Sequence, residues 1–207
     1  NKPAGRPPKT DKSLKESLLD AAVSLFARTG VANTSIKDVG VAGGATPAMV
    51  YYYFKSKEDL VEEVISARFL PIVSEIWHFE EGEFADPLGM TAGLQKRLIE
   101  KALALPWFLP LWSREIFSEN GVLRNHITKF VDSLPIRRFI GALRQGQQDG
   151  TINKDILPEM MFMSLIGATM LPMLTGKTWE SILHEPIEME RIALHASSLI
   201  LNGIRPA

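Results

Sequence analysis

The chain has 207 residues, of which 45% are hydrophobic, with 23 Lys and Arg against 24 Asp and Glu and no Cys. This length suits one large or two small domains with a hydrophobic core. Without Cys, disulfide scaffolds, Cys-ligated metal centres and thiol nucleophiles are excluded, and we expect a cytoplasmic protein. The first residues contain no apolar stretch typical of a signal peptide. The longest mostly apolar run, residues 160–174, is shorter than the roughly 17–25 residues of a spanning helix, so we expect no membrane partner.

Basic residues are concentrated at the start of the sequence. Residues 1–60 contain nine Lys and Arg against six Asp and Glu, so they carry a net charge of +3 and the rest of the chain −4. Pro3, Pro7 and Pro8 exclude a helix over residues 1–10 and favour an extended basic arm. Such an arm suits a polyanionic partner, although a solvated tail would have the same composition.

A stripe of apolar residues at helical spacing begins at Leu14 and predicts a first helix over about 13–29. Ser13 and Glu16 fit a capping box at the start of this helix. Gly30 fits the left-handed backbone position that follows a helix end, so we expect the chain to turn there.

Two short helices joined by a glycine turn are predicted next. A capping pattern that begins at Ser35 opens a short helix that ends in Gly43 and Gly44, two residues that can adopt the unusual backbone angles of a turn. Thr46 can cap a third helix with Pro47 at the first position, where the missing N–H costs nothing. The arrangement predicts a helix-turn-helix motif at about 35–54.

A further capping pattern at Ser56 starts a long helical stripe through Leu60, Val64, Ala67 and Leu70. We therefore expect an all-α protein in three parts. They are an extended arm at 1–10, a three-helix DNA-binding domain at 11–57, and a larger helical domain for ligand binding and dimerisation at 58–207.

Helical periodicity continues through the larger domain, and no segment has the period of a strand. The predicted helices are one from Asp86 to about Leu105, one that begins at Pro106, a long one from about Val122 to Gln148 with a bend near Pro135, one over 160–174, and a last one from about Ile187 to Gly203, with a turn at Gly150 and Asn153.

Residues 160–174 are apolar around nearly the whole circumference of the predicted helix, so two sides need cover. The domain itself can cover one side. We therefore expect a homodimer in which helices at about 156–175 and 187–203 pair with their copies as a four-helix bundle, the alternative being a fully internal core.

The third predicted helix carries Tyr at each of residues 51–53. At about 100° per residue, Val50 and Phe54 lie on one face, which we expect to pack on Leu25 and Phe26. The three tyrosines then point in three directions, so at least one hydroxyl faces solvent, where a phosphate oxygen can accept its hydrogen bond. Alternatively, the tyrosine rings pack against the domain and only their hydroxyl groups reach water.

These features form one combined pattern of a glycine turn, adjacent aromatic residues and a Lys three positions after Phe54. It is carried by Leu18, Leu19, Asp20, Ala21, Ala22, Leu25, Phe26, Gly30, Thr34, Ser35, Ile36, Val39, Gly44, Ala45, Thr46, Val50, Tyr51, Tyr52, Tyr53, Phe54, Ser56, Lys57, Glu58, Asp59 and Leu60. The pattern closely resembles the N-terminal DNA-binding domain of the tetracycline-repressor (TetR/AcrR) family of bacterial regulators. Beyond residue 70 the resemblance is only architectural.

The resemblance implies that particular side chains contact double-stranded DNA. Positions that face bases correspond to Thr46, Pro47, Ala48 and Met49, and positions near the backbone or bases to Tyr51, Tyr52 and Tyr53. Lys57 corresponds to a phosphate-contacting lysine of the fourth helix, and Lys37 to a second-helix position that can reach a groove edge or a phosphate. Thr34 and Ser35 would offer helix N-terminal amides to a phosphate.

The sequence departs from the family pattern in two ways. The recognition helix lacks Arg, Asn and Gln, which read bases in a bidentate way, and Gly40 and Gly43 stand where alanine is commoner. We therefore expect modest base readout, through the Thr46 hydroxyl and apolar contacts of Pro47 and Ala48 with thymine methyls, supplemented by DNA shape.

Arg6 and Lys9 lie beside prolines in the arm, which resembles the minor-groove arms of AT-hook peptides. A narrow groove rich in A·T pairs attracts such a cation, so both are candidate DNA contacts, the alternative being a disordered tail.

The resemblance also implies a ligand pocket in the larger domain, and its many aromatic and Met side chains suit a flat, largely apolar effector. The candidate lining residues are Trp77, Met90, Leu94, Trp107, Phe108, Trp112, Phe117, Phe130, Arg144 and Met163. Arg114 and Glu115 are further candidates for polar contacts, although surface positions would explain them equally well.

The function implied is a ligand-responsive homodimeric transcription regulator, most simply a repressor released from a roughly palindromic operator by a small effector. We expect no cofactor and no metal, because His78, His126, His184 and His195 lack metal-type spacing. The alternatives are a helical sensor that acts through protein partners, and an all-α enzyme, for which no catalytic motif is present.

Overall fold

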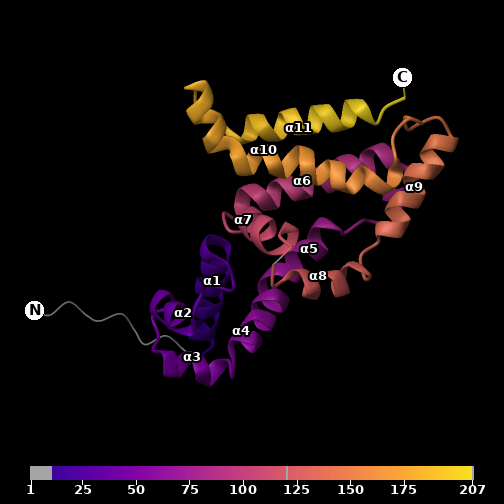
Figure 1. Ribbon diagram of the computed structural model, residues 1–207. Helices are drawn as coiled ribbons and strands as arrows, with labels where there is room; N and C mark the ends of the chain where they lie inside the picture. Colours follow the sequence, from indigo (N-terminus) through magenta and orange to yellow (C-terminus); the bar gives the residue numbers. More distant parts are fainter. Residues whose placement is uncertain (1–10, 120, 207) are drawn as a thin grey trace, which may run out of the picture. The chain divides into compact units, whose positions relative to one another are not determined.

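The computed structural model describes residues 11–119 and 121–206 (Figure 1). These residues form helices joined by turns, with no strand among them, so the predicted all-α class is confirmed. The elements divide into two compact units. One holds the described residues up to 71 together with 110–129, and the other holds 72–109 together with the described residues from 130 onward.

The division differs from the boundary expected at residue 57. The start of the fourth helical segment and residues 110–129 pack with the helix-turn-helix elements instead of with the rest of the larger domain. The chain passes from one unit to the other within α5 (Leu70–Ile76), α7 (Phe108–Trp112) and α8 (Arg124–Val131).

The first unit is built from the helices of residues 11–69 and one short later segment. Its elements are α1 (Asp11–Thr29), α2 (Ile36–Gly43), α3 (Pro47–Tyr53), α4 (Lys57–Val64), the π-helix η1 (Ile65–Phe69) and the π-helix η3 (Ser113–Phe117). Its core takes fully buried side chains from successive elements, namely Leu18, Phe26, Val39, Val50 and Phe69. Each burial of this kind contributes about 1.5–3 kcal/mol, which is why these short helices are stable together.

The start of the first helix differs from the sequence expectation. Helix α1 already includes Asp11, so Ser13 lies inside it and cannot be its N-cap; the Ser13 carbonyl accepts the Ser17 hydroxyl proton at 2.8 Å. The predicted end is confirmed, because Gly30 follows the helix at φ 87° and donates its N–H to Phe26 O.

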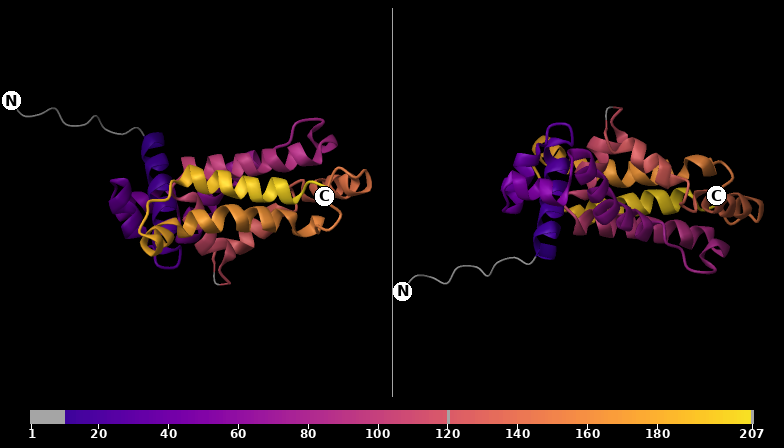
Figure 2. Two further views of the ribbon diagram at one scale, coloured as in Figure 1. Left: turned by 90° about the horizontal axis from the view of Figure 1, so that it is seen from above. Right: turned by 90° about the horizontal axis from the view of Figure 1, so that it is seen from below.

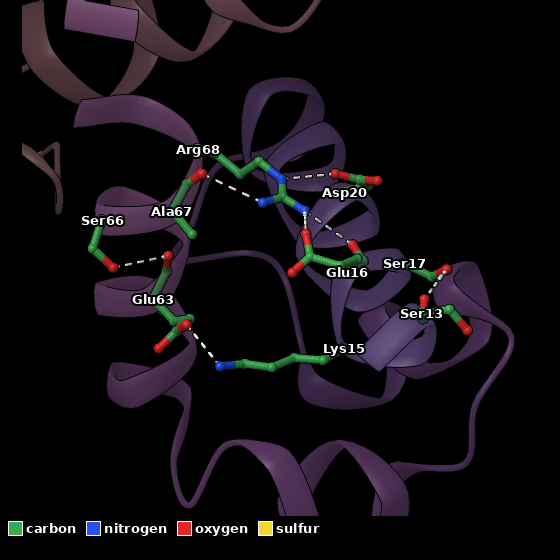
Figure 3. A network of polar contacts seen from close by, with 9 residues as sticks. All are labelled: Ser13, Lys15, Glu16, Ser17, Asp20, Glu63, Ser66, Ala67 and Arg68. Carbon is green, nitrogen blue, oxygen red and sulfur yellow. Dashed lines mark hydrogen bonds and ion pairs between the residues drawn. The ribbon is translucent and has the colours of Figure 1, made fainter. Parts of the chain in front are cut away.

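An ion-pair network joins α1 to η1 (Figure 3). Arg68 donates to Glu16 Oε2 at 2.5 Å and to Asp20 Oδ1 at 2.8 Å, and Lys15 Nζ lies 2.7 Å from Glu63 Oε1. The hydrogen bond and the charge of Arg68 hold the pKa of Glu16 below its usual range. The network therefore ties the first helix to the segment that leads toward the second unit.

Glu115 makes a second tie within the first unit. Its carboxylate is 4% exposed and accepts the backbone N–H of Val31 at 2.8 Å and of Val122 at 3.0 Å. The loop after α1 and the segment after η3 are therefore held by one buried side chain, since a buried carboxylate needs such donors.

The second unit is a bundle of longer helices. Its elements are the 3₁₀ turns η2 (Glu83–Ala85) and η4 (Pro158–Met160) and the helices α6 (Pro87–Ala104), α9 (Ile136–Gln148), α10 (Met161–Leu183) and α11 (Met189–Gly203). Helices α10 and α11 run side by side in both figures (Figures 1 and 2). The buried amide of Gln95 on α6 donates to Thr169 Oγ1 on α10 at 3.1 Å.

Several predicted boundaries in this part are confirmed and one is wrong. Asp86 caps α6 by accepting the Gly89 N–H, and Gly150 turns the chain at φ 72°. The single long helix expected from Val122 to Gln148 is instead two helices, α8 and α9, with a turn at 132–135 between them. Pro135 has no N–H to continue the helical hydrogen bonds, so the helix breaks there instead of bending.

Helix α10 is longer than the apolar run in the sequence. Residues 158–183 form a helical stretch of 26 residues that is long and apolar enough to cross a membrane. In its most apolar 18-residue segment, 39% is buried in the structure. The expectation that this segment is too short to span is therefore wrong for the helix as a whole, because helix continues past Leu174 through more polar residues. Length and composition do not separate a core helix from a spanning one.

We predict that Arg68→Gln lowers the melting temperature at pH 7 by about 2 °C, because it removes the ion pairs with Glu16 and Asp20. Since the pKa of Glu16 is lowered in the folded state, this stabilisation is present above the ordinary value near 4.5 and is lost as the pH falls through the lowered pKa. Melting curves from pH 7 to pH 3 followed by circular dichroism measure the difference.

The matched control is Arg28→Gln, which removes an exposed Arg of α1 that has no ion pair among the described residues. Its effect at pH 7 should be smaller than that of Arg68→Gln. An Arg68→Gln difference as large at pH 3 as at pH 7 would contradict the assignment.

Candidate nucleic-acid interface

Helix α3 is held in the first unit by one face and exposes the others. Val50 is fully buried, and Phe54, the C-cap residue, is 2% exposed. The predicted buried face is thus confirmed. The exposed residues at the start of the helix are Thr46, Pro47, Ala48 and Met49.

Both helices of the motif are capped as predicted. Ser35 Oγ accepts the Asp38 N–H at 3.2 Å, and Asp38 Oδ2 accepts the Ser35 N–H at 3.0 Å. The Ser35 hydroxyl also donates to Asp38 Oδ2 at 2.5 Å, and this bond, together with the one from the Ser35 N–H, holds the pKa of Asp38 below its usual range. Thr46 Oγ1 accepts the Met49 N–H at 3.3 Å, with Pro47 at the first helical position. The caps fix where α2 and α3 begin.

Glycine allows a close approach at the α1–α2 contact and a left-handed backbone in the turn. A Cβ atom on Gly43 would lie 2.6 Å from Leu18 Cδ2, so α2 packs directly on α1. Gly44 has φ 76°, which side-chain-bearing residues rarely adopt. One of the glycines that departs from the family pattern therefore allows a closer helix approach than alanine would.

The three tyrosines differ in exposure. Tyr51 is 53% exposed and Tyr52 76%, whereas Tyr53 is partly buried, with its ring edge-on to Tyr52 at 5.2 Å between centroids. The expectation that at least one hydroxyl reaches solvent holds for the first two. Their positions beside the exposed start of α3 suit contact with a backbone phosphate.

Candidate phosphate contacts of the first unit are exposed, with one exception. Ser35 and Lys37 are exposed at the start of α2, and Lys57 is partly exposed, with Nζ donating to Ala32 O at 3.1 Å. A single bond to a carbonyl leaves the ammonium two further protons for an anion.

Thr34 is the exception. Its side chain is 2% exposed, and its hydroxyl donates to Gly30 O at 2.7 Å and lies 3.0 Å from Thr29 Oγ1. Its backbone N–H donates to Val31 O. Thr34 therefore stabilises the turn after α1, and the expected surface role is corrected.

The structure shows two residues whose placement the sequence did not indicate. Val41 on α2 is an apolar side chain that is 72% exposed. Glu115, expected in a ligand pocket or at the surface, is instead a buried acceptor that fixes the loop before α2. Glu115 and Val31 are 84 positions apart in the sequence, and no local sequence pattern indicates this contact. The arm candidates Arg6 and Lys9 lie outside the described residues.

Comparison with known proteins identifies this unit. Residues 18–64 match the family model described as bacterial regulatory proteins, tetR family. The HTH-type transcriptional regulator AcrR of Shigella flexneri is 38% identical over 50 residues, which cover 24% of this chain and 23% of that protein. This part of the chain is therefore similar to the DNA-binding part of tetR-family regulators.

The fold agrees over nearly the whole chain. The ketosteroid transcriptional regulator KstR2 of Mycobacterium tuberculosis superposes with a TM-score of 0.70 at 18% identity, over 97% of this chain and 99% of that chain. The SmeT–triclosan complex superposes with a TM-score of 0.62 at 22% identity, over 93% and 91%. The chain thus has the fold of these regulators, a helix-turn-helix unit together with a helical domain.

The sequence match is narrower than the fold match. It spans less than a third of the length of the curated relatives first matched. These relatives are transcription regulators and not enzymes.

The effector residues expected from the sequence are divided between the two units. Trp112 and Phe117 belong to the first unit and the others to the second. Four of them are at most 8% exposed and pack in the cores, namely Met90, Leu94, Phe108 and Trp112. Three others are exposed, namely Phe117, Arg144, which pairs with Glu159, and Met163. Trp107 is partly buried. Aromatic side chains at helical spacing close on one another instead of leaving space. Trp77 and Phe130 do line a cavity, of about 320 Å³.

We predict that Thr46→Ala lowers the free energy of unfolding by about 1 kcal/mol, because it removes the oxygen that caps α3. Thr46→Ser keeps this oxygen and should stay within about 0.5 kcal/mol of the parent. Urea unfolding of the three proteins tests this. Equal losses for the Ala and Ser variants would show that the capping bond contributes nothing.

Proposed function

We propose that this protein is a transcription regulator that binds double-stranded DNA as a homodimer and releases it when a small molecule binds. The observation that carries the proposal is the capped, solvent-exposed α3 on a unit that matches the tetR-family model. A helix of this kind enters the major groove with its first residues on base edges.

The surface of α3 supports readout by shape and apolar contact. The exposed side chains at its start offer one hydroxyl, Thr46, and the apolar groups of Pro47, Ala48 and Met49. Without Arg, Asn or Gln there, bidentate recognition of a base is absent from this helix. Thymine methyl contacts and groove geometry then supply specificity.

Phosphate contacts would hold the motif in place. Lys37 and Lys57 provide charge, and Ser35 together with the start of α2 provides hydroxyl and amide donors. Tyr51 and Tyr52 add two phenolic donors on the same short helix. Basic arm residues Arg6 and Lys9 would extend the contact into a minor groove.

Dimerisation would occur through α10 and α11. Met160, which directly precedes α10, and Met163, Gly167 and Leu171 on α10 recur every three or four residues, and all four are exposed. A Cβ on Gly167 would meet nothing within 4 Å, so another backbone can approach there. Apolar patches of this kind are typical of interfaces, and a two-fold pair of these helices forms a four-helix bundle.

Repression and release follow from the spacing of the two motifs. In a dimer, two recognition helices must reach successive major grooves roughly 34–36 Å apart. An effector that binds better to a dimer with another spacing lowers the affinity for DNA by its differential affinity. Two comparisons support this assignment. A relative in sequence is named a repressor, and the structural neighbours include a ketosteroid regulator and a complex with triclosan.

An electrophoretic mobility shift against DNA from the region beside the protein's own gene tests the function. Retardation that depends on sequence and falls steeply with salt is expected of a regulator. A sensor acting through protein partners, or an enzyme, would show no such retardation.

We predict that Lys57→Ala weakens binding by a similar factor on all DNA sequences. Loss of one phosphate contact should reduce the slope of log K against log [salt] by about one unit. Fluorescence anisotropy on operator and random duplexes over a salt series measures both quantities.

The control is Lys96→Ala, which removes an exposed Lys of α6 in the other unit. It should leave affinity and slope unchanged. If Lys57→Ala behaves like the control, Lys57 does not contact phosphate.

We predict that Leu171→Lys or Leu194→Lys dissociates the dimer without unfolding the chain, because these side chains are 61% and 71% exposed in one subunit. Burying a Lys at a dimer interface costs several kcal/mol. Light scattering after gel filtration reports the mass.

Val41→Lys is the matched control, since Val41 is equally exposed but lies on α2. It should remain dimeric. A monomeric parent protein at micromolar concentration, or Leu variants that stay dimeric, would exclude this interface.

A further inference from the structure

The cavity in the second unit has aromatic walls and one cationic side. It measures about 320 Å³, and its lining includes Trp77, Phe79, Phe84, Phe130, Leu134 and Arg138. The volume is at the lower end for small-molecule sites, so it suits a molecule of one or two rings.

The aromatic wall is braced by its neighbours. Trp77 is 3% exposed and meets Phe139 edge-on at 5.9 Å and Phe162 at 4.6 Å between ring centroids. Phe79 and Phe84 lie 5.0 Å apart. Because these rings are held by packing, a flat ligand would find a preformed surface instead of having to order one.

Arg138 supplies the charge. Its guanidinium lies 4.1 Å from the centroid of the Phe84 ring, and it has no carboxylate within ion-pair distance among the described residues. Arg97, which lies 5.0 Å from the Phe79 ring, differs in that Glu83 is 3.5 Å away. Stacking on Phe84 orients the planar fork of Arg138 while its donors remain available.

The other polar groups of the lining fit an anion. They are Ser74, Ser133 and His78, and no Asp or Glu contributes to the lining. His78 Nε2 lies 3.1 Å from Glu80 Oε1, so the carboxylate nearest to this lining residue already has a hydrogen-bond partner. The lining therefore presents aromatic side chains, hydroxyls and the guanidinium of Arg138, and it contains no carboxylate of its own.

We propose that this cavity binds a small aromatic carboxylate, with its ring beside Phe79 and Phe84, which are half-buried, and its carboxylate on Arg138. A guanidinium donates two parallel hydrogen bonds to a carboxylate, which gives both affinity and orientation. The ligand would be the effector of the regulator, and this last step rests on the proposed function. Phe130 offers a route for the response, because it lies on α8, whose earlier residues belong to the DNA-binding unit.

Isothermal titration with 2-naphthoate and its neutral isostere 2-naphthamide tests the proposal on the full chain without DNA. We expect the parent protein to bind naphthoate more tightly than naphthamide. Arg138→Gln should lower the affinity for naphthoate by about 10- to 100-fold, because hydrogen bonds to a charged group are lost. The affinity for naphthamide should stay unchanged. Unchanged naphthamide binding also shows that the variant keeps the cavity.

The matched control is Arg137→Gln, which makes the same charge change at an exposed neighbour outside the lining. It should bind naphthoate like the parent. The proposal is overturned if neither probe binds the parent at millimolar concentration, if both probes bind it equally, if Arg138→Gln weakens both probes alike, or if Arg137→Gln weakens naphthoate as much as Arg138→Gln.

A parallel mobility shift separates this proposal from the proposed function. If the parent binds naphthoate through Arg138 but no DNA is retarded, the ligand site stands and the regulatory function fails. If DNA is retarded but naphthoate does not bind, the function stands and this ligand assignment fails.

Discussion

The burial of Val50 and Phe54 in the first unit determines which faces of α3 meet the solvent. With these two side chains in the core, the start of the helix and two of its tyrosines are presented outward. A helix of seven residues has no stability of its own in water, so this packing is what keeps it helical. Its orientation in turn depends on the direct approach of α2 to α1 at Gly43, where a side chain would meet Leu18. The candidate DNA surface therefore follows from interior contacts.

Two polar ties extend this core. The Arg68 network joins α1 to the π-helical segment after α4, and the buried Glu115 holds the loop before α2 to the chain after η3. Both ties involve π-helical segments. Such segments are rare in proteins, and those that occur often lie at functional sites. The chain also passes from unit to unit through helices and not through loose linkers. The second unit is thus joined by continuous helices to the unit that holds α3.

The second unit uses its apolar residues for three purposes. Buried side chains such as Met90 and Leu94 fill its core, those on the outer side of α10 and α11 remain exposed for a proposed partner copy, and the aromatic group around Trp77 borders a cavity. Composition alone treats these sets as equivalent. Their separation explains why a list of aromatic and Met residues is a poor guide to a ligand site.

The sequence by itself determined the elements whose signals are local. Caps at Ser35, Thr46 and Asp86, the left-handed glycines and the buried face of α3 involve residues within about one helical turn, so their spacing is sufficient. Only the tertiary structure decided the burial of Thr34, the break before α9, the role of Glu115 and the cavity beside Arg138. These depend on contacts between residues far apart in the chain, and on which of many similar apolar side chains meet, which no periodicity encodes.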